Sequence, residues 1–132
     1  MRLFRRRRPE PSGVLRRGDH SEDAADYAVF TVGENRFPET FAELRPQATA
    51  PVDGVARLRQ RATLVPVRDP QFGVAEVRVE FDGMAAGYLR PPHLGLVAAD
   101  LEAANAVAMD VPALVEWGPA GPTVTLIIAG RG

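Results

Sequence analysis

Hydrophobic and polar residues alternate along the middle of the chain with the two-residue period of a half-buried β-strand. The alternation is clearest over residues 74–81. Its apolar side consists of Val77, Val79 and Phe81, and its polar side of Glu76, Arg78 and Glu80. Asp82 and Gly83 follow, and both tolerate the positive φ angles of a two-residue hairpin turn. The pattern therefore predicts that residues 84–90 return as an antiparallel partner strand, which the prolines at 91 and 92 end.

A second alternating segment covers residues 56–67 and places arginines on one side of the predicted strand. We call Arg57, Arg59 and Arg61 the arginine ladder. The opposite side carries Leu58, Ala62 and Leu64. This pattern predicts a half-buried strand with a basic outer face. Two interpretations of the ladder stay open, a solvated strand surface and a binding surface.

Three more segments have the composition of strands, and two that of helices. The strands are predicted over residues 28–32, 112–117 and 123–129, with a turn over 118–122. The helices are a short turn over residues 40–44 and an amphipathic helix over 94–107, in which Leu94, Val97, Leu101 and Ala104 recur at helical spacing. Antiparallel hairpins with few helices predict a mainly β protein with some α structure. We expect a small antiparallel OB-like or SH3-like β-barrel with one or two covering helices.

Charge divides the chain into two parts. The 132 residues contain 16 arginines, no lysine and 17 acidic residues, for a net charge of −1. Residues 1–17 hold seven arginines against one acid, a charge of +6, and the remaining residues carry −7. We predict a disordered tail and linker over residues 1–25, basic and then acidic, followed by one barrel domain over 26–132. The tail is either solvated or an arm that contacts phosphate or an anionic membrane surface.

Candidate catalytic chemistry is sparse. The chain has no cysteine, which excludes disulfides, thiolate metal sites and a cysteine nucleophile. His20 and His93 are not spaced as a ligand pair, and Ser12 and Ser21 lack the glycines of a nucleophile elbow. We therefore predict a protein that is not an enzyme and needs no cofactor or metal. No apolar stretch is long enough to span a membrane and no signal peptide is visible, so we expect a cytoplasmic protein.

Two segments resemble the HIRAN domain family. The first is Val-Gly-Glu-Asn-Arg-Phe at residues 32–37, which is similar to the family's early strand and its polar and aromatic cluster. The second is residues 64–89, where an Asp-Pro turn at 69–70 precedes an alternating strand, a Gly-containing hairpin turn and a Gly-Tyr-Leu strand. In order of elements, the resemblance covers about residues 28–129.

The resemblance implies a compact barrel related to oligonucleotide-binding folds, found on DNA-remodelling ATPases and in short bacterial proteins. It also implies capture of the 3′ end of single-stranded DNA. Phe37, Phe72 and Tyr88 would then line a groove, with Asn35 and Arg36 available to phosphates or base edges. Arg57, Arg59, Arg61 and Arg68 would have to gather on the same face, because the acidic domain otherwise repels a polyanion.

Two functions follow from these observations. The first is a non-catalytic module that binds single-stranded DNA. The second is a protein-interaction or scaffold domain that keeps the barrel without binding nucleic acid, because a fold does not fix a function. For the aromatic residues, core packing is the alternative to groove lining.

Overall fold

One 14-residue strand, β3 (Ala56–Asp69), connects the two halves of the structure. Its first part pairs antiparallel with β6 (Ala108–Gly118), and its second part with β4 (Gly73–Phe81). The computed structural model describes residues 10–18, 28–71 and 73–128. Within these ranges the strand predicted from the alternation at 56–67 is confirmed and extends two residues further.

The strands close into a barrel. Beyond β4 the order continues through β5 (Met84–Leu89), β2 (Ala28–Val32) and β7 (Gly121–Ile127), and β7 pairs with β6 to complete the circle. All the pairings within this circle are antiparallel. The prediction of a mainly β, small OB-like barrel is confirmed.

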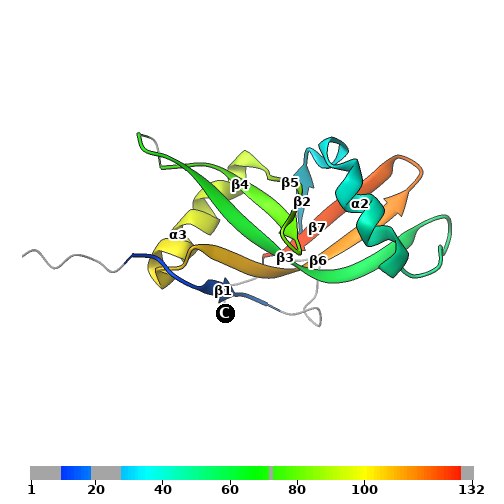
Figure 1. The fold of residues 1–132 in the computed structure, drawn as a ribbon, viewed down its shortest axis with the longest axis horizontal. Helices are drawn as coiled ribbons and strands as arrows, with labels where there is room; N and C mark the ends of the chain where they lie inside the picture. The colour runs from blue at the N-terminus through cyan, green and yellow to red at the C-terminus, as the bar shows by residue number, and fades with distance from the viewer. Residues whose placement is uncertain (1–9, 19–27, 72, 129–132) are drawn as a thin grey trace, which may run out of the picture.

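Two α-helices lie at opposite ends of the barrel (Figure 1). At one end α2 (Pro38–Leu44) buries Phe41 and Leu44, and at the other α3 (Leu94–Ala104) buries Val97 and Leu101. Short 3₁₀ turns adjoin them at η1 (Glu34–Arg36), η2 (Arg45–Gln47) and η3 (Pro91–His93). The helices therefore close the two openings that a barrel of this size leaves.

The predicted extent of the second helix is wrong at its end. We expected it to reach residue 107, but α3 stops at Ala104. Asn105 has a φ of 52° in the left-handed region, where asparagine commonly ends a helix. Ala104, predicted on the apolar face, is exposed.

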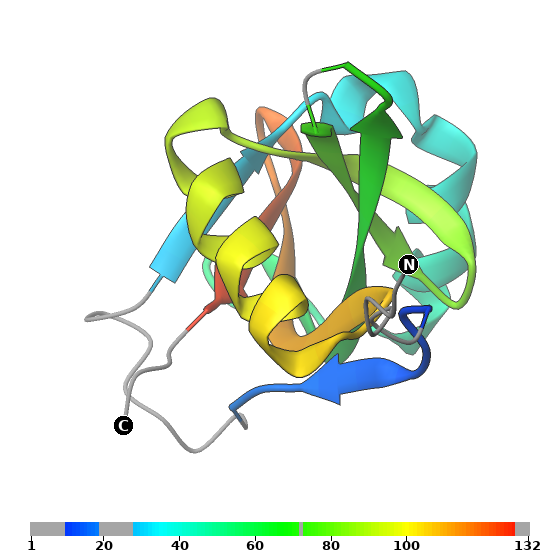
Figure 2. The ribbon, with the colours of Figure 1, turned by 90° about the vertical axis from the view of Figure 1, so that its left-hand side faces the viewer.

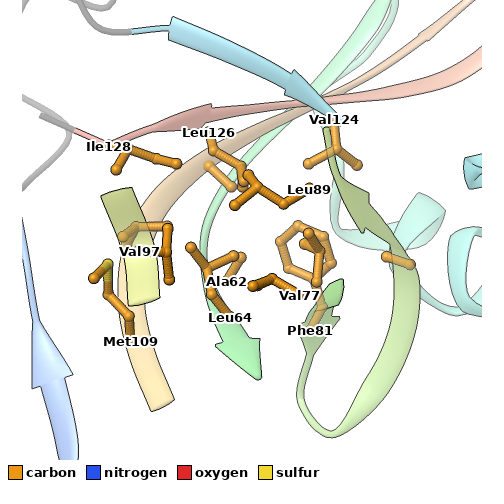
Figure 3. Packing of buried hydrophobic residues seen from close by; sticks show 14 of the residues in the cluster. Ala62, Leu64, Val77, Phe81, Leu89, Val97, Met109, Val124, Leu126 and Ile128 are labelled. Carbon is orange, nitrogen blue, oxygen red and sulfur yellow. The ribbon is translucent and has the colours of Figure 1, made fainter. Parts of the chain in front are cut away.

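The barrel interior is filled by the apolar sides of the alternating strands (Figure 3). Val77, Val79 and Phe81 of β4 are fully buried, as are Ala62 and Leu64 of β3. The predicted turn also forms, since Asp82 and Gly83 both have positive φ, 51° and 81°. The hairpin and the inward face are thus specified by local sequence.

A short strand lies within the segment predicted to be a linker. Residues 14–16 form β1 (Val14–Arg16), which pairs parallel with residues 108–110 of β6. Figure 2 shows β1 (blue) along the outside of the barrel beside β6 (orange). The linker prediction is therefore corrected at these three residues, because a strand this short gives no recognisable periodicity.

Substitutions at two glycines test how closely β2 and β5 pack. A Cβ at Gly87 in β5 would lie 2.9 Å from the carbonyl oxygen of Val32, which the sheet holds in place. We expect Gly87→Ala to lower the free energy of unfolding by about 1–3 kcal/mol. Gly95→Ala in α3 is the matched control, because nothing lies within 4 Å of its Cβ position. It should stabilise by up to about 1 kcal/mol. Denaturant unfolding measures both, and equal effects would contradict the close approach of β2 to Gly87.

Candidate binding site

The turn after β2 places η1 against strand β5. Gly33 has a φ of 83°, and a Cβ there would lie 3.1 Å from Cδ2 of Tyr88. Glycine therefore permits both the left-handed turn and the close approach. The chain then carries Phe37 to Tyr88, with ring centroids 5.8 Å apart and planes tilted by 54°. Two segments about 50 residues apart in sequence thus form one aromatic pair.

Tyr88 belongs to a row of side chains on the outer face of the sheet. It lies directly across from Val32 on β2 and from Arg78 on β4, and side chains of opposed residues point to the same side. Val32 is 40% exposed. Arg78 donates from Nε to Oε2 of Glu80 at 2.7 Å and keeps 38% of its side chain exposed. An arginine therefore flanks the aromatic pair on the β4 side.

Phe30 extends this surface along β2. It lies two residues before Val32, hence on the same face, and is 59% exposed. We call this surface the β2–β5 face, defined as Phe30, Val32, Phe37, Arg78 and Tyr88, with the exposed Arg36 next to Phe37 in the chain. The sequence pattern and the resemblance point to Arg36, Phe37 and Tyr88 but not to Phe30 or Arg78. The alternation within 28–32 was the available signal for Phe30, since it puts Phe30 and Thr31 on opposite sides.

The arginine ladder lies elsewhere. Its residues point outward as predicted, but on the part of β3 that pairs with β6, whereas Tyr88 lies on β5 with β4 between. Nε of Arg57 donates to Oε2 of Glu116 at 2.9 Å, and Arg61 pairs with Asp110. Of the three, Arg59 alone is exposed, and the other two are half-buried. Glu116 and Asp110 of β6 therefore neutralise the charges of Arg57 and Arg61, which leaves less positive charge for binding phosphates.

Arg61 also holds the N-terminal segment on the barrel. Its NH1 donates to the carbonyl of Gly18 at 3.0 Å, and NH2 donates to the carbonyls of Arg17 at 2.9 Å and Asp110 at 3.1 Å. The guanidinium thus joins the residues that follow β1 to β3 and β6. Several N–H donors in a fixed planar arrangement are characteristic of arginine, and in this protein they stabilise the fold by binding backbone carbonyls.

The fourth predicted arginine of β3, Arg68, lies apart from the arginine ladder. Arg68 lies eleven residues after Arg57 on β3, roughly 36 Å along the strand. It lines a cavity of about 590 Å³ together with Val74, Leu101 and Ala106. Phe72 lies outside the described residues. The structure therefore does not gather all four predicted arginines of β3 at one site.

A groove opens between α2 and the β6–β7 turn on the other side of η1. Its volume is about 370 Å³. We call it the α2 groove. Its apolar wall is Pro38, Phe41, Ala42, Trp117 and Pro122, and its polar groups come from Glu34, Asn35 and Arg45. The Trp117 ring meets Phe41 edge-on with centroids 6.5 Å apart, and the Arg45 guanidinium lies 5.8 Å from the Trp117 centroid. The resemblance points to Asn35 as a site residue but not to Trp117 or Arg45.

Within the described residues, the side chains of His, Asp and Glu do not form a group of three suited to a metal ion. His93 lies on η3, and His20 falls outside the described residues. No helix among the residues that the structure describes is both long and apolar enough to cross a membrane. Comparison with protein-family models, curated proteins and solved structures finds no match to this chain.

The two kinds of ladder arginine should differ in their effect on stability. Arg61→Ala removes a guanidinium that serves Asp110 and two carbonyls of residues 17–18. We expect it to lower the free energy of unfolding by about 1–3 kcal/mol. Arg59→Ala should change it by less than about 0.5 kcal/mol. Thermal or denaturant unfolding measures the difference, and equal losses would contradict a stabilising role of the Arg61 hydrogen bonds.

Proposed function

We propose that this protein is a non-catalytic module that binds single-stranded nucleic acid, with the 3′ end of DNA as its preferred target. The observation that carries the proposal is the half-buried Phe37–Tyr88 pair, with Arg78 opposite Tyr88 and the exposed Arg36 next to Phe37 in the chain. A base stacked on an aromatic side chain gains about 1–3 kcal/mol, and neighbouring arginines neutralise phosphates.

The position of the HIRAN-like segments supports this proposal. The segment at residues 32–37 and the Gly-Tyr-Leu segment at 87–89 are far apart in sequence, yet they meet where Gly33 lies under Tyr88. The preference for a 3′ end comes from that resemblance alone. The acidic body favours a short ligand, because only a few phosphates can lie near arginines.

Exchange of the tyrosine tests the stacking surface. We expect Tyr88→Leu to weaken binding of a short single-stranded DNA about 5- to 150-fold, because the stacking contribution of one base is lost. Fluorescence anisotropy with a labelled oligonucleotide measures the dissociation constant. Arg59→Ala is the control and should bind like the original protein. Blocking the 3′ hydroxyl with a phosphate should weaken binding as well, and equal affinity for blocked and free ends would remove the end preference.

The salt dependence of binding counts the phosphate contacts. With Arg36 and Arg78 each neutralising one phosphate, the logarithm of the association constant should fall against the logarithm of salt concentration with a slope of about −1.4. Arg36→Ala should reduce the slope to about −0.7. A slope that Arg36→Ala and Arg78→Ala both leave unchanged would place the phosphates elsewhere.

A second candidate function is docking of a protein segment on the same face. Exposure of Phe30 and Val32 favours it, since large apolar side chains side by side on a sheet surface commonly mark an interface. Under this alternative, Phe30→Ala weakens a protein complex whose affinity changes little with salt, and the protein has no measurable affinity for oligonucleotides at low ionic strength.

A further inference from the structure

The 3₁₀ turn η1 lies between two surfaces of different character. Phe37, just after the turn, packs on Tyr88 of the β2–β5 face, while Glu34 and Asn35 line the α2 groove. The Cα atoms of Asn35 and Phe37 are at most about 7 Å apart, because each residue spans no more than about 3.6 Å. A nucleic-acid strand bound at Phe37 can therefore reach the groove with its next nucleotide.

We propose that the α2 groove is a second subsite that takes one nucleobase of the strand bound on the β2–β5 face. This proposal rests on the proposed function. It adds a defined pocket for one base, with Trp117 and Arg45 as the residues that receive it.

The wall of the groove has the chemistry that a base needs. Trp117 presents aromatic carbon and packs on the buried Phe41, and the Arg45 guanidinium lies 5.8 Å from the Trp117 centroid. Unpaired bases stack both on aromatic rings and on arginine planes. Arg45 also supplies a positive charge next to the phosphate that such a base carries.

The size of the α2 groove and its polar groups restrict which ligands it can bind. A volume of about 370 Å³ is near the lower end for small-molecule sites, which suits one nucleotide and not a longer segment. Asn35 is exposed and offers an amide with both donor and acceptor, the pair that matches the edge of adenine. Oε2 of Glu34 accepts a hydrogen bond from the backbone N–H of Val124 at 3.3 Å, so this carboxylate is engaged with β7. We therefore expect adenine to be preferred over thymine.

Trp117 makes the subsite directly observable, because it is the only tryptophan of the chain. The full-length protein is titrated with oligodeoxyadenylate of six nucleotides carrying a free 3′ end. Tryptophan fluorescence and the anisotropy of a labelled copy should change with the same midpoint. Oligodeoxythymidylate should bind more weakly, and Asn35→Ala should remove this difference.

A substitution that fills the α2 groove provides a second test of the subsite. Ala42 is exposed on α2 and lines the groove, so Ala42→Leu occupies it without touching the core. We expect about tenfold weaker binding and loss of the fluorescence change. Ala103→Leu, an exposed alanine of α3, is the control and should leave both signals unchanged.

The outcomes separate the two proposals. Anisotropy that reports binding while Trp117 fluorescence stays constant, or while Ala42→Leu binds normally, overturns the subsite and leaves the proposed function standing. No binding of any oligonucleotide overturns both. A fluorescence response to an apolar peptide alone assigns the groove to a protein partner and also overturns the subsite.

Discussion

The exchange of partners along β3 is the constraint on which the other features depend. Thr63 and Leu64 pair on both sides, with Glu80 and Val79 of β4 and with Asp110 and Met109 of β6. Before this point β3 pairs with β6 alone, and after it with β4 alone. Leu64 is fully buried there. A slip of one residue would turn Leu64 outward and Arg61 and Thr63 inward, so the barrel has one register.

Features that local sequence determines were predictable. The alternation of β3 and β4 and the Asp82–Gly83 turn are properties of adjacent residues, and they appear in the structure as expected. The end of α3 was not predictable in this way. The helix-forming composition continues beyond Ala104, but the left-handed conformation of Asn105 ends the helix there. The strand at Val14–Arg16 depends on hydrogen bonds to residues more than 90 positions away, and no local pattern encodes them.

The candidate site was predictable only in part, for a similar reason. The resemblance pointed to Asn35, Arg36, Phe37 and Tyr88, and the structure brings Phe37 and Tyr88 into contact. Arg78 was visible as a polar-face residue, but its place opposite Tyr88 depends on the register of β4 with β5. Conversely, the arginine ladder resembles a basic surface in the sequence, because its three arginines are close together there. Their acidic partners, Glu116 and Asp110, are distant in sequence and come close only through the pairing of β3 with β6.

The parallel pairing of β1 with β6 fixes where the N-terminal region joins the barrel. Since both strands run in the same direction, the chain before Val14 enters beside Ala108, at the α3 end. Trp117 lies nine residues further along β6, roughly 30 Å along the strand. A label attached at Ser12, whose backbone N–H donates to the carbonyl of Asn105, is therefore held at the end of the barrel opposite to the α2 groove.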